Sequence, residues 1–131
     1  MRANRGFTLV EILIVVVILG ILAAIVIPQF TEASTEAKTS RLASDLQTMR
    51  SQIELYKVQH SDTAPAVATF DTDMTTRDAG DGFGPYLQKV PTNPFVTNEP
   101  NVVDLEGADC GWHYDPNTGA IHAADADHEA L

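Results

Sequence analysis

The sequence predicts an α+β fold, in which a long N-terminal helix, membrane-spanning in its first half, packs on a small antiparallel β-sheet. Three observations support this prediction. Residues 12–27 carry no charged side chain, residues 31–60 carry one apolar stripe at helical spacing, and three short strand candidates follow residue 100. A chain of 131 residues has room for one anchor and one small domain.

The first part of the helix is long enough to cross a membrane. Residues 7–27 form an almost wholly apolar run, and about 20 such residues span a bilayer. Arg2 and Arg5 precede this run, which places the N-terminus in the cytoplasm. Of the 18 Asp and Glu residues, 17 follow Ile27, and this acidic remainder repels nucleic acid and anionic lipid head groups. We therefore expect no nucleic-acid partner.

Two other kinds of N-terminal segment fit less well. A cleaved secretory signal also begins with basic residues, but here Glu11 interrupts the apolar core and residues 22–24 give a poor cleavage site. An ordinary single-span anchor explains the hydrophobicity. It leaves Gly6, Phe7 and Glu11 without a role.

Glu11 is the most informative residue in this segment. An acidic side chain near the centre of a spanning helix costs roughly 2.5–3.5 kcal/mol, less toward the interface, so such a residue has a functional role by default. Cleavage between Gly6 and Phe7 would create an ammonium group on Phe7. That group would lie one helical turn from Glu11, or within reach of Glu11 on a neighbouring chain.

These residues resemble the processing and assembly signature of the type IV pilin superfamily. The matching positions are Arg2, Arg5, Gly6, Phe7, Glu11 and Pro28. The resemblance implies that a prepilin peptidase removes the leader, residues 1–6, and methylates the amine of Phe7. It further implies that Glu11 guides subunit docking and that residues 7–30 form the transmembrane and filament-core helix.

The helix is expected to continue beyond the apolar run. Pro28 removes one backbone hydrogen bond and predicts a bend, but residues 31–60 contain no Gly or Pro. Spacings of 4, 3, 4 and 3 place one stripe on this amphipathic continuation: Leu42, Leu46, Met49, Ile53 and Tyr56. We expect the stripe to pack on the C-terminal domain; a coiled coil is the alternative.

Residues 61–131 are predicted to form a periplasmic globular region. Residues 61–82 form a loop with one short helix near 67–70, and three prolines make residues 84–95 a rigid connector. The pattern Gly84-Pro85-Tyr86-Leu87, with Pro91 and Asn93-Pro94, resembles the connector of major pseudopilins, the G-type subunits of type II secretion systems.

The strand candidates are residues 101–105, 111–114 and 120–123, with a hairpin turn at 115–119. We expect three antiparallel strands on the helix stripe, with a core around Leu105, Trp112, Tyr114 and Ile121. The single cysteine, Cys110, excludes an intramolecular disulfide. It is interpreted as a small buried side chain beside Trp112, with a reactive or intermolecular thiol as the alternative.

The sequence contains no nucleophile–base arrangement and no phosphate-binding loop, so we expect no enzyme. Major pseudopilins bind calcium between C-terminal strands, which implies Asp104, Glu106 and Asp109 as ligands here. The acidic runs do not fit the EF-hand spacing, and the long Asp- and Gly-rich ending of that family is missing. His113 and His122 are a further candidate metal pair across the hairpin.

The resemblance implies a structural subunit of the type II secretion pseudopilus. Such a subunit waits in the inner membrane, surrounded by lipid, and then polymerises with itself into a periplasmic fibre. That fibre helps to drive folded proteins through an outer-membrane secretin. The implied partners are minor pseudopilins, the prepilin peptidase and an inner-membrane assembly platform with its ATPase. The alternatives are a type IV pilin for adhesion, motility or DNA uptake, and a membrane-anchored binding domain that never polymerises.

Overall fold

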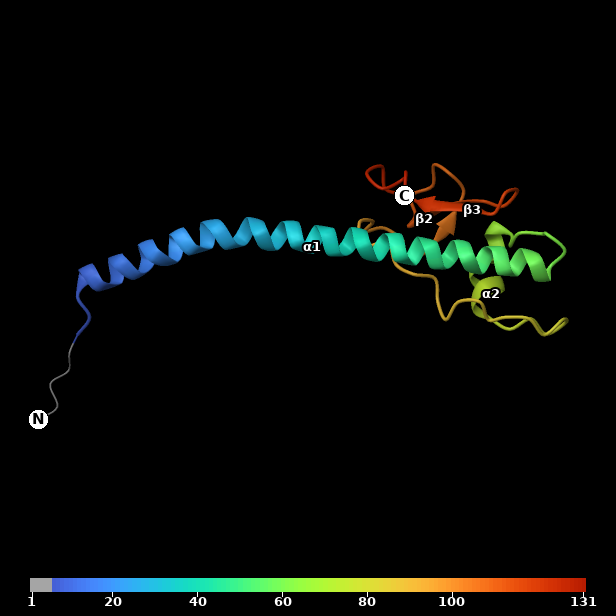
Figure 1. The fold of residues 1–131 in the computed structure, drawn as a ribbon, viewed down its shortest axis with the longest axis horizontal. Coiled ribbons are helices and arrows are strands. Elements are labelled where there is room, and N and C mark those ends of the chain that lie inside the picture. Colours follow the sequence, from blue (N-terminus) through green and yellow to red (C-terminus); the bar gives the residue numbers. More distant parts are fainter. Residues whose placement is uncertain (1–5) are drawn as a thin grey trace, which may run out of the picture. The chain divides into compact units, whose positions relative to one another are not determined.

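The computed structural model describes residues 6–131; Arg2, Arg5 and the rest of residues 1–5 lie outside the described residues. The chain divides into two compact units, the first ending at Ala37 and the second covering Lys38–Leu131. The elements follow in the order α1 (Leu9–Gln59), η1 (Val67–Thr69), α2 (Phe70–Thr75), β1 (Val103–Asp104), β2 (Trp112–Asp115) and β3 (Ala120–Ala123) (Figure 1).

Helix α1 confirms the single long helix that the sequence predicts, with Pro28 in its interior. It ends where Ser61 and Asp62 adopt positive φ angles of 56° and 63°. The amide of Asp62 donates to the carbonyl of Lys57 at 2.8 Å, a bond that closes the last turn in the manner of a Schellman cap. The chain then reverses direction toward η1 and α2.

The large apolar residues from Phe7 to Phe30, which precede and begin α1, are uncovered within the chain. Their exposed fractions run from 50% at Ile18 to 83% at Phe7. Among the described residues, α1 is the one helix whose length and composition would allow it to cross a membrane. Because water is a poor solvent for such a surface, this segment needs lipid or other protein around it.

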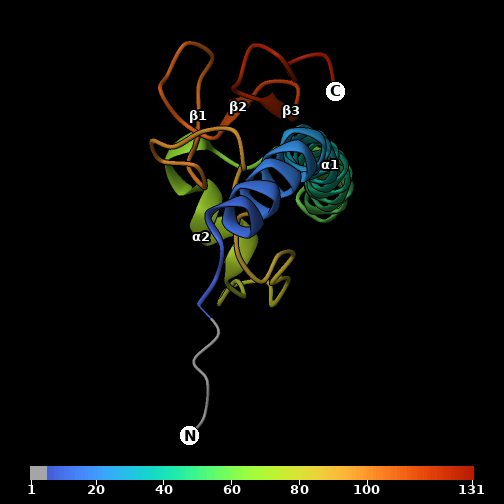
Figure 2. The ribbon, with the colours of Figure 1, turned by 90° about the vertical axis from the view of Figure 1, so that its left-hand side faces the viewer.

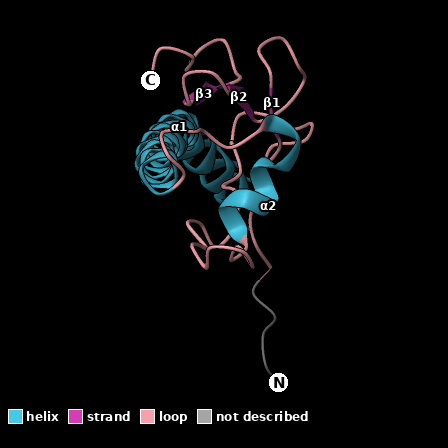
Figure 3. Ribbon diagram, turned by 90° about the vertical axis from the view of Figure 1, so that its right-hand side faces the viewer, coloured by secondary structure: helices cyan, strands magenta, loops and turns pink. Residues whose placement is uncertain are grey.

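The predicted stripe forms the base of the core in residues 38–131. Leu42, Leu46, Met49 and Ile53 are at most 1% exposed, while Tyr56 is partly buried beside them. In residues 38–131, α2 and the sheet approach α1 from different sides (Figures 2 and 3). The rest of the core comes from α2, the connector and the strands: Phe70, Met74, Leu87, Val90, Val103, Trp112, Tyr114, Ile121 and Ala123.

The sheet has the strand order β1-β2-β3. Strands β2 and β3 are antiparallel, as predicted, and Tyr114 lies opposite Ile121. The expectation of a wholly antiparallel sheet was wrong for β1, which runs parallel to β2. Parallel strands usually require a long crossover. Here β1 has only two residues, so the loop of residues 105–111 suffices to bring the chain back.

The hairpin turn confirms the predicted chemistry. Gly119 has a φ of 80°, and its amide donates to the carbonyl of Asp115 at 2.8 Å. The Asp115 carboxylate accepts bonds from the Asn117 amide at 2.9 Å and the Thr118 hydroxyl at 2.8 Å. These bonds hold the pKa of Asp115 below its ordinary value. Their contribution to stability is therefore present above that ordinary pKa and is lost as the pH falls through the lowered one.

The prediction that Leu105 lies in the core was wrong, since this residue is 53% exposed. Strand β1 ends at Asp104, whose carboxylate accepts a bond from the Leu105 amide at 2.7 Å. The chain then turns, with the Ala108 amide donating to the Leu105 carbonyl at 3.2 Å. The strand alternation that would have placed Leu105 in the core stops one residue too early.

The connector joins the core through buried hydrogen bonds. Asn93 is 1% exposed; its amide nitrogen donates to the Gly111 carbonyl at 3.0 Å and to Asp125 at 2.9 Å. Its side-chain oxygen accepts a bond from the Phe95 amide at 2.9 Å. The preceding Pro91 carbonyl accepts a bond from the Trp112 indole at 2.8 Å. The Asn93-Pro94 step thus ties the connector to both the sheet and the C-terminal loop.

Trp112 is fully buried, and truncating a buried Trp to Ala typically costs about 3–5 kcal/mol. We predict that W112A lowers the thermal midpoint of the full chain in detergent, as followed by circular dichroism. L105A is the matched control and should leave the midpoint nearly unchanged. Equal midpoints for W112A and the wild type would contradict the packing described above.

Asn93 allows a test of the polar tie. N93A removes three hydrogen bonds at a buried position, a loss that costs roughly 1–3 kcal/mol. The Gly111 carbonyl keeps its bond from the Ala124 amide, whereas the Phe95 amide loses the Asn93 side-chain acceptor. We expect a lower midpoint and faster hydrogen exchange at the Phe95 amide. Asn101→Ala, at an exposed position, is the control. Unchanged exchange at Phe95 in N93A would show that the tie contributes nothing.

Candidate processing and assembly site

Gly6 and Phe7 precede the first turn of α1 and are both exposed. Phe7 is 83% exposed, and a Cβ built on Gly6 would meet no atom within 4 Å. Nothing in the described part of the chain covers the backbone at this point. The peptide bond between these two residues is therefore sterically open to a peptidase.

Glu11 lies in the first turn of α1 and is paired with Thr8. The Thr8 amide and the Thr8 hydroxyl each donate to Oε2 of Glu11 at 2.9 Å. In return, the Glu11 amide donates to the Thr8 hydroxyl at 3.2 Å. This reciprocal arrangement is a capping box, which satisfies two amide groups that a helix N-terminus otherwise leaves without partners.

Thr8 is the site residue that the sequence analysis missed. The signal was available, because Thr8 and Glu11 have the Ser/Thr-x-x-Glu spacing that marks a helix N-terminus before an apolar run. The structure therefore gives Glu11 a partner within its own chain. Its carboxylate also lies at the positive end of the helix dipole, where negative charge is stabilised.

Pro28 lies within α1, at a position where its ring nitrogen cannot donate to the preceding turn. The hydroxyl of Thr31 donates to the carbonyl of Ile27 at 3.1 Å, next to the missing bond. The helix is continuous through this point. The bend expected at Pro28 and its role in assembly stay predictions.

The residues implied as calcium ligands lie at the end of β1 (Asp104) and in the loop after it (Glu106 and Asp109). Oδ1 of Asp104 accepts a bond from the Leu105 amide, Oδ2 of Asp109 accepts one from Asn98 at 2.7 Å, and Glu106 is exposed. Among residues 6–131, the one set of three potential ligand atoms that converge is His60, Asp78 and Asp81. The calcium assignment stays a prediction.

His113 and His122 face each other across β2 and β3, as the hairpin register predicts. Their ring centroids are 5.5 Å apart and their planes are nearly perpendicular. Nε2 of His113 is 3.1 Å from the Ala108 carbonyl, so this nitrogen already has a neighbour. In the described part of the chain no third ligand joins the two rings.

Cys110 is buried, as expected, and its thiol lies 3.2 Å from the Trp112 carbonyl, to which it donates. Burial raises the pKa of this thiol. Since the thiolate is the reactive form, the raised pKa favours the structural interpretation over a reactive one.

The comparisons with known proteins agree with this site. The family described as "Prokaryotic N-terminal methylation motif" matches residues 1–27. The chain is 42% identical over 60 residues to type II secretion system core protein G of Dickeya chrysanthemi, covering 46% of this chain and 39% of that one. It is 31% identical over 101 residues to the protein of that name from Vibrio cholerae, covering 72% and 68%.

A fimbrial protein of Pseudomonas aeruginosa is 33% identical over 103 residues, covering 76% of this chain and 67% of that protein. No solved structure gave a significant match. The chain matches less than half the length of several relatives, such as 44% of core protein G of Klebsiella pneumoniae. Taken with the exposed Gly6-Phe7 bond and the Glu11 cap, these matches show that the chain belongs to the type IV pilin superfamily, within which it most resembles the G-type pseudopilins.

Proposed function

We propose that this protein is the structural subunit of a type II secretion pseudopilus and not an enzyme. The observation that carries the proposal is the uncovered apolar surface of residues 7–27, headed by Glu11. An anchor that only spans a membrane has no use for a carboxylate at this position. A helix that moves from lipid into a bundle of identical helices can use it to set the register between neighbours.

The proposed assembly step is a transfer of this helix from lipid into the filament core. The Phe7 ammonium and the Glu11 carboxylate would each be costly in that core without a partner. Oε2 of Glu11 is already bonded within the chain, and Oε1 is the atom that we assign to the Phe7 ammonium of an adjacent subunit. A subunit that enters in register pairs both charges, whereas one out of register strands them.

We further propose a membrane topology and the proteins that act on this subunit. The N-terminus is cytoplasmic, the helix crosses the bacterial inner membrane once, and residues 61–131 lie in the periplasm. A prepilin peptidase removes residues 1–6 and methylates Phe7, and an inner-membrane platform with its ATPase adds each subunit to the fibre. Minor pseudopilins are further partners, and the fibre helps to move folded proteins through the secretin.

A type IV pilin for adhesion, motility or DNA uptake is the second candidate. The fimbrial relatives, at 33% identity, favour it. The single Cys110 and the connector around Asn93 favour the pseudopilin, because many pilins close their C-terminal region with a cysteine pair. Genes for a secretin and a secretion ATPase beside this one would support the pseudopilin.

Processing is tested by replacing Gly6. We predict that wild-type protein isolated from membranes begins at a methylated Phe7, whereas G6V stays uncut, because the peptidase would have to accommodate a branched side chain at the cleaved bond. Mass analysis of the N-terminal peptide gives the answer. G20V is the matched control, since Gly20 also lies in open surroundings, and it should be cleaved. A wild-type protein that starts at Met1 or after Ala24 would reject the pilin assignment.

The role of Glu11 can be separated from its role as a helix cap. We predict that E11L and E11Q are both inserted and cleaved but form few filaments, since neither supplies a charge for Phe7. Gln retains a capping-box acceptor, so E11Q removes the charge and keeps the cap. T8V keeps the charge, removes the two hydroxyl bonds of the cap and leaves the bond from the Thr8 amide, and it should still form filaments. E11D should be partly active because its reach is shorter.

Each variant would be overproduced together with a type II assembly machinery, and surface filaments would be counted by electron microscopy. Normal filament numbers with E11Q would reject the charge-pairing mechanism. Loss of filaments in T8V alone would show that the cap, and not the charge, is what assembly requires.

A further inference from the structure

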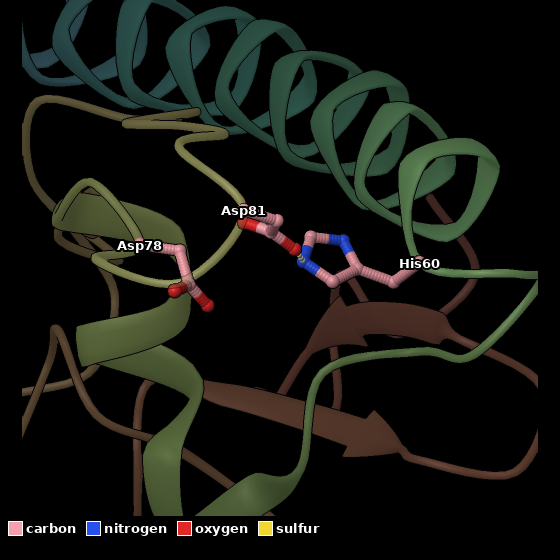
Figure 4. A group of neighbouring side chains, drawn as sticks. All are labelled: His60, Asp78 and Asp81. Atoms are coloured by element: carbon pink, nitrogen blue, oxygen red, sulfur yellow. Dashed lines mark ion pairs between the residues drawn. The ribbon is translucent and has the colours of Figure 1, made fainter.

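A second group of chemically matched side chains lies at the far end of α1. His60 follows the last residue of the helix, while Asp78 and Asp81 belong to the loop after α2 (Figure 4). One ring nitrogen of His60 and one carboxylate oxygen from each aspartate lie within 4.8 Å of one another. Nε2 of His60 is 3.3 Å from Oδ2 of Asp81.

The orientation of His60 is fixed by its own helix. Nδ1 lies 2.9 Å from the Tyr56 carbonyl, which can only accept, so Nδ1 carries a proton and donates. The ring also stacks on Tyr56, with centroids 3.9 Å apart and an angle of 12° between the planes. A histidine that donates one nitrogen to a carbonyl presents the other as a metal ligand in many metal sites.

This orientation places two hydrogen-bond acceptors opposite each other. In the neutral ring, Nε2 bears a lone pair, and that lone pair would face the Asp81 carboxylate. Two acceptors at 3.3 Å repel each other unless a cation lies between them. The cation is either a proton on Nε2 or a metal ion bound by both groups.

The loop supports both aspartates. Oδ1 of Asp78 accepts a bond from the Gly80 amide at 2.6 Å, and Oδ1 of Asp81 accepts one from the Phe83 amide at 3.3 Å. The Asp78 amide in turn donates to the Phe83 carbonyl at 2.9 Å. Each carboxylate thus uses one oxygen to hold the loop and keeps Oδ2 for a further ligand.

The surroundings favour a cation. A cavity of about 220 Å³ beside the cluster is lined by the aromatic rings of Tyr56, Phe83 and Tyr86. Besides His60, its charged lining side chains are two carboxylates and one guanidinium: Asp73, Asp78 and Arg77. The Asp81 carboxylate adds a further negative charge next to His60. The Arg77 Nε donates to the Gly82 carbonyl at 2.9 Å, within the same loop.

We propose that His60, Asp78 and Asp81 form a binding site for a divalent transition metal, with Zn²⁺ as the expected ion. One imidazole nitrogen and two carboxylate oxygens suit zinc, whereas calcium prefers oxygen ligands alone. Ligand atoms around tetrahedral zinc are about 3.3 Å apart, so binding would require the exposed Asp78 to rotate its side chain toward the ion. Water would complete the coordination. The bound ion would cross-link the end of α1 to residues 78–81.

The test uses the full chain, without a polyhistidine tag, purified in detergent and stripped of metal with a chelator. Zn²⁺ is titrated in competition with a chromophoric zinc indicator, and Ca²⁺ is titrated in parallel. We expect one equivalent of zinc per chain, and a D78N/D81N variant that binds at least tenfold more weakly. D127N/E129Q is the matched control, because it also removes two exposed carboxylates, outside both candidate metal sites, and should bind zinc like the wild type.

Two further measurements distinguish a metal ion bound between His60 and Asp81 from a proton on His60. Zinc should raise the thermal midpoint of the wild type and not that of D78N/D81N. In wild-type spectra recorded by NMR, the ring C–H signals of His60 should shift with saturation at one equivalent, while those of His113 should not. The proposal would be overturned by any of three results: no stoichiometric zinc binding, unchanged zinc affinity in D78N/D81N, or His60 ring signals that do not shift when zinc is added.

Discussion

One packed face of α1 supports all the structure in residues 38–131. Leu42, Leu46, Met49 and Ile53 are almost completely removed from solvent by the sheet, by α2 and by the connector. The sheet could not stand without this face, because β1 has two residues and a lone hairpin is marginal in water. Trp112 illustrates the dependence: its ring completes the core, and its indole nitrogen bonds to the connector at Pro91.

The two parts of α1 differ in what covers their apolar side chains. From Lys38 onward the helix has an apolar stripe and a domain to cover it. Before Ala37 its large apolar residues are half exposed or more, so their cover must come from outside the chain. The capping box of Thr8 and Glu11 gives the Glu11 carboxylate a hydrogen-bond partner within its own chain, which it would keep in the proposed filament core.

Polar groups position the loops that the apolar core leaves undefined. Asn93 joins the connector to Gly111 and Asp125, and the turn after β2 is held by Asp115. At the end of α1, the positive φ angles of Ser61 and Asp62 turn the chain away and leave His60 facing the loop that carries Asp81. In each case the backbone conformation determines which polar atoms come within hydrogen-bonding distance. The chemistry of the side chains then determines whether they form a hydrogen bond or could bind an ion.

The sequence by itself determined the features that depend on local pattern. Periodicity predicts helix α1 and its stripe from Leu42 to Ile53, and turn chemistry predicts the hairpin at Asp115. The cost of a charge within a membrane-spanning helix marks Glu11, together with the Gly6-Phe7 step before it, as functional. Only the tertiary structure decided the parallel pairing of β1, the exposure of Leu105 and the convergence of His60 with Asp78 and Asp81. Those features depend on where loops return the chain in space, and neither periodicity nor turn chemistry in the sequence specifies that path.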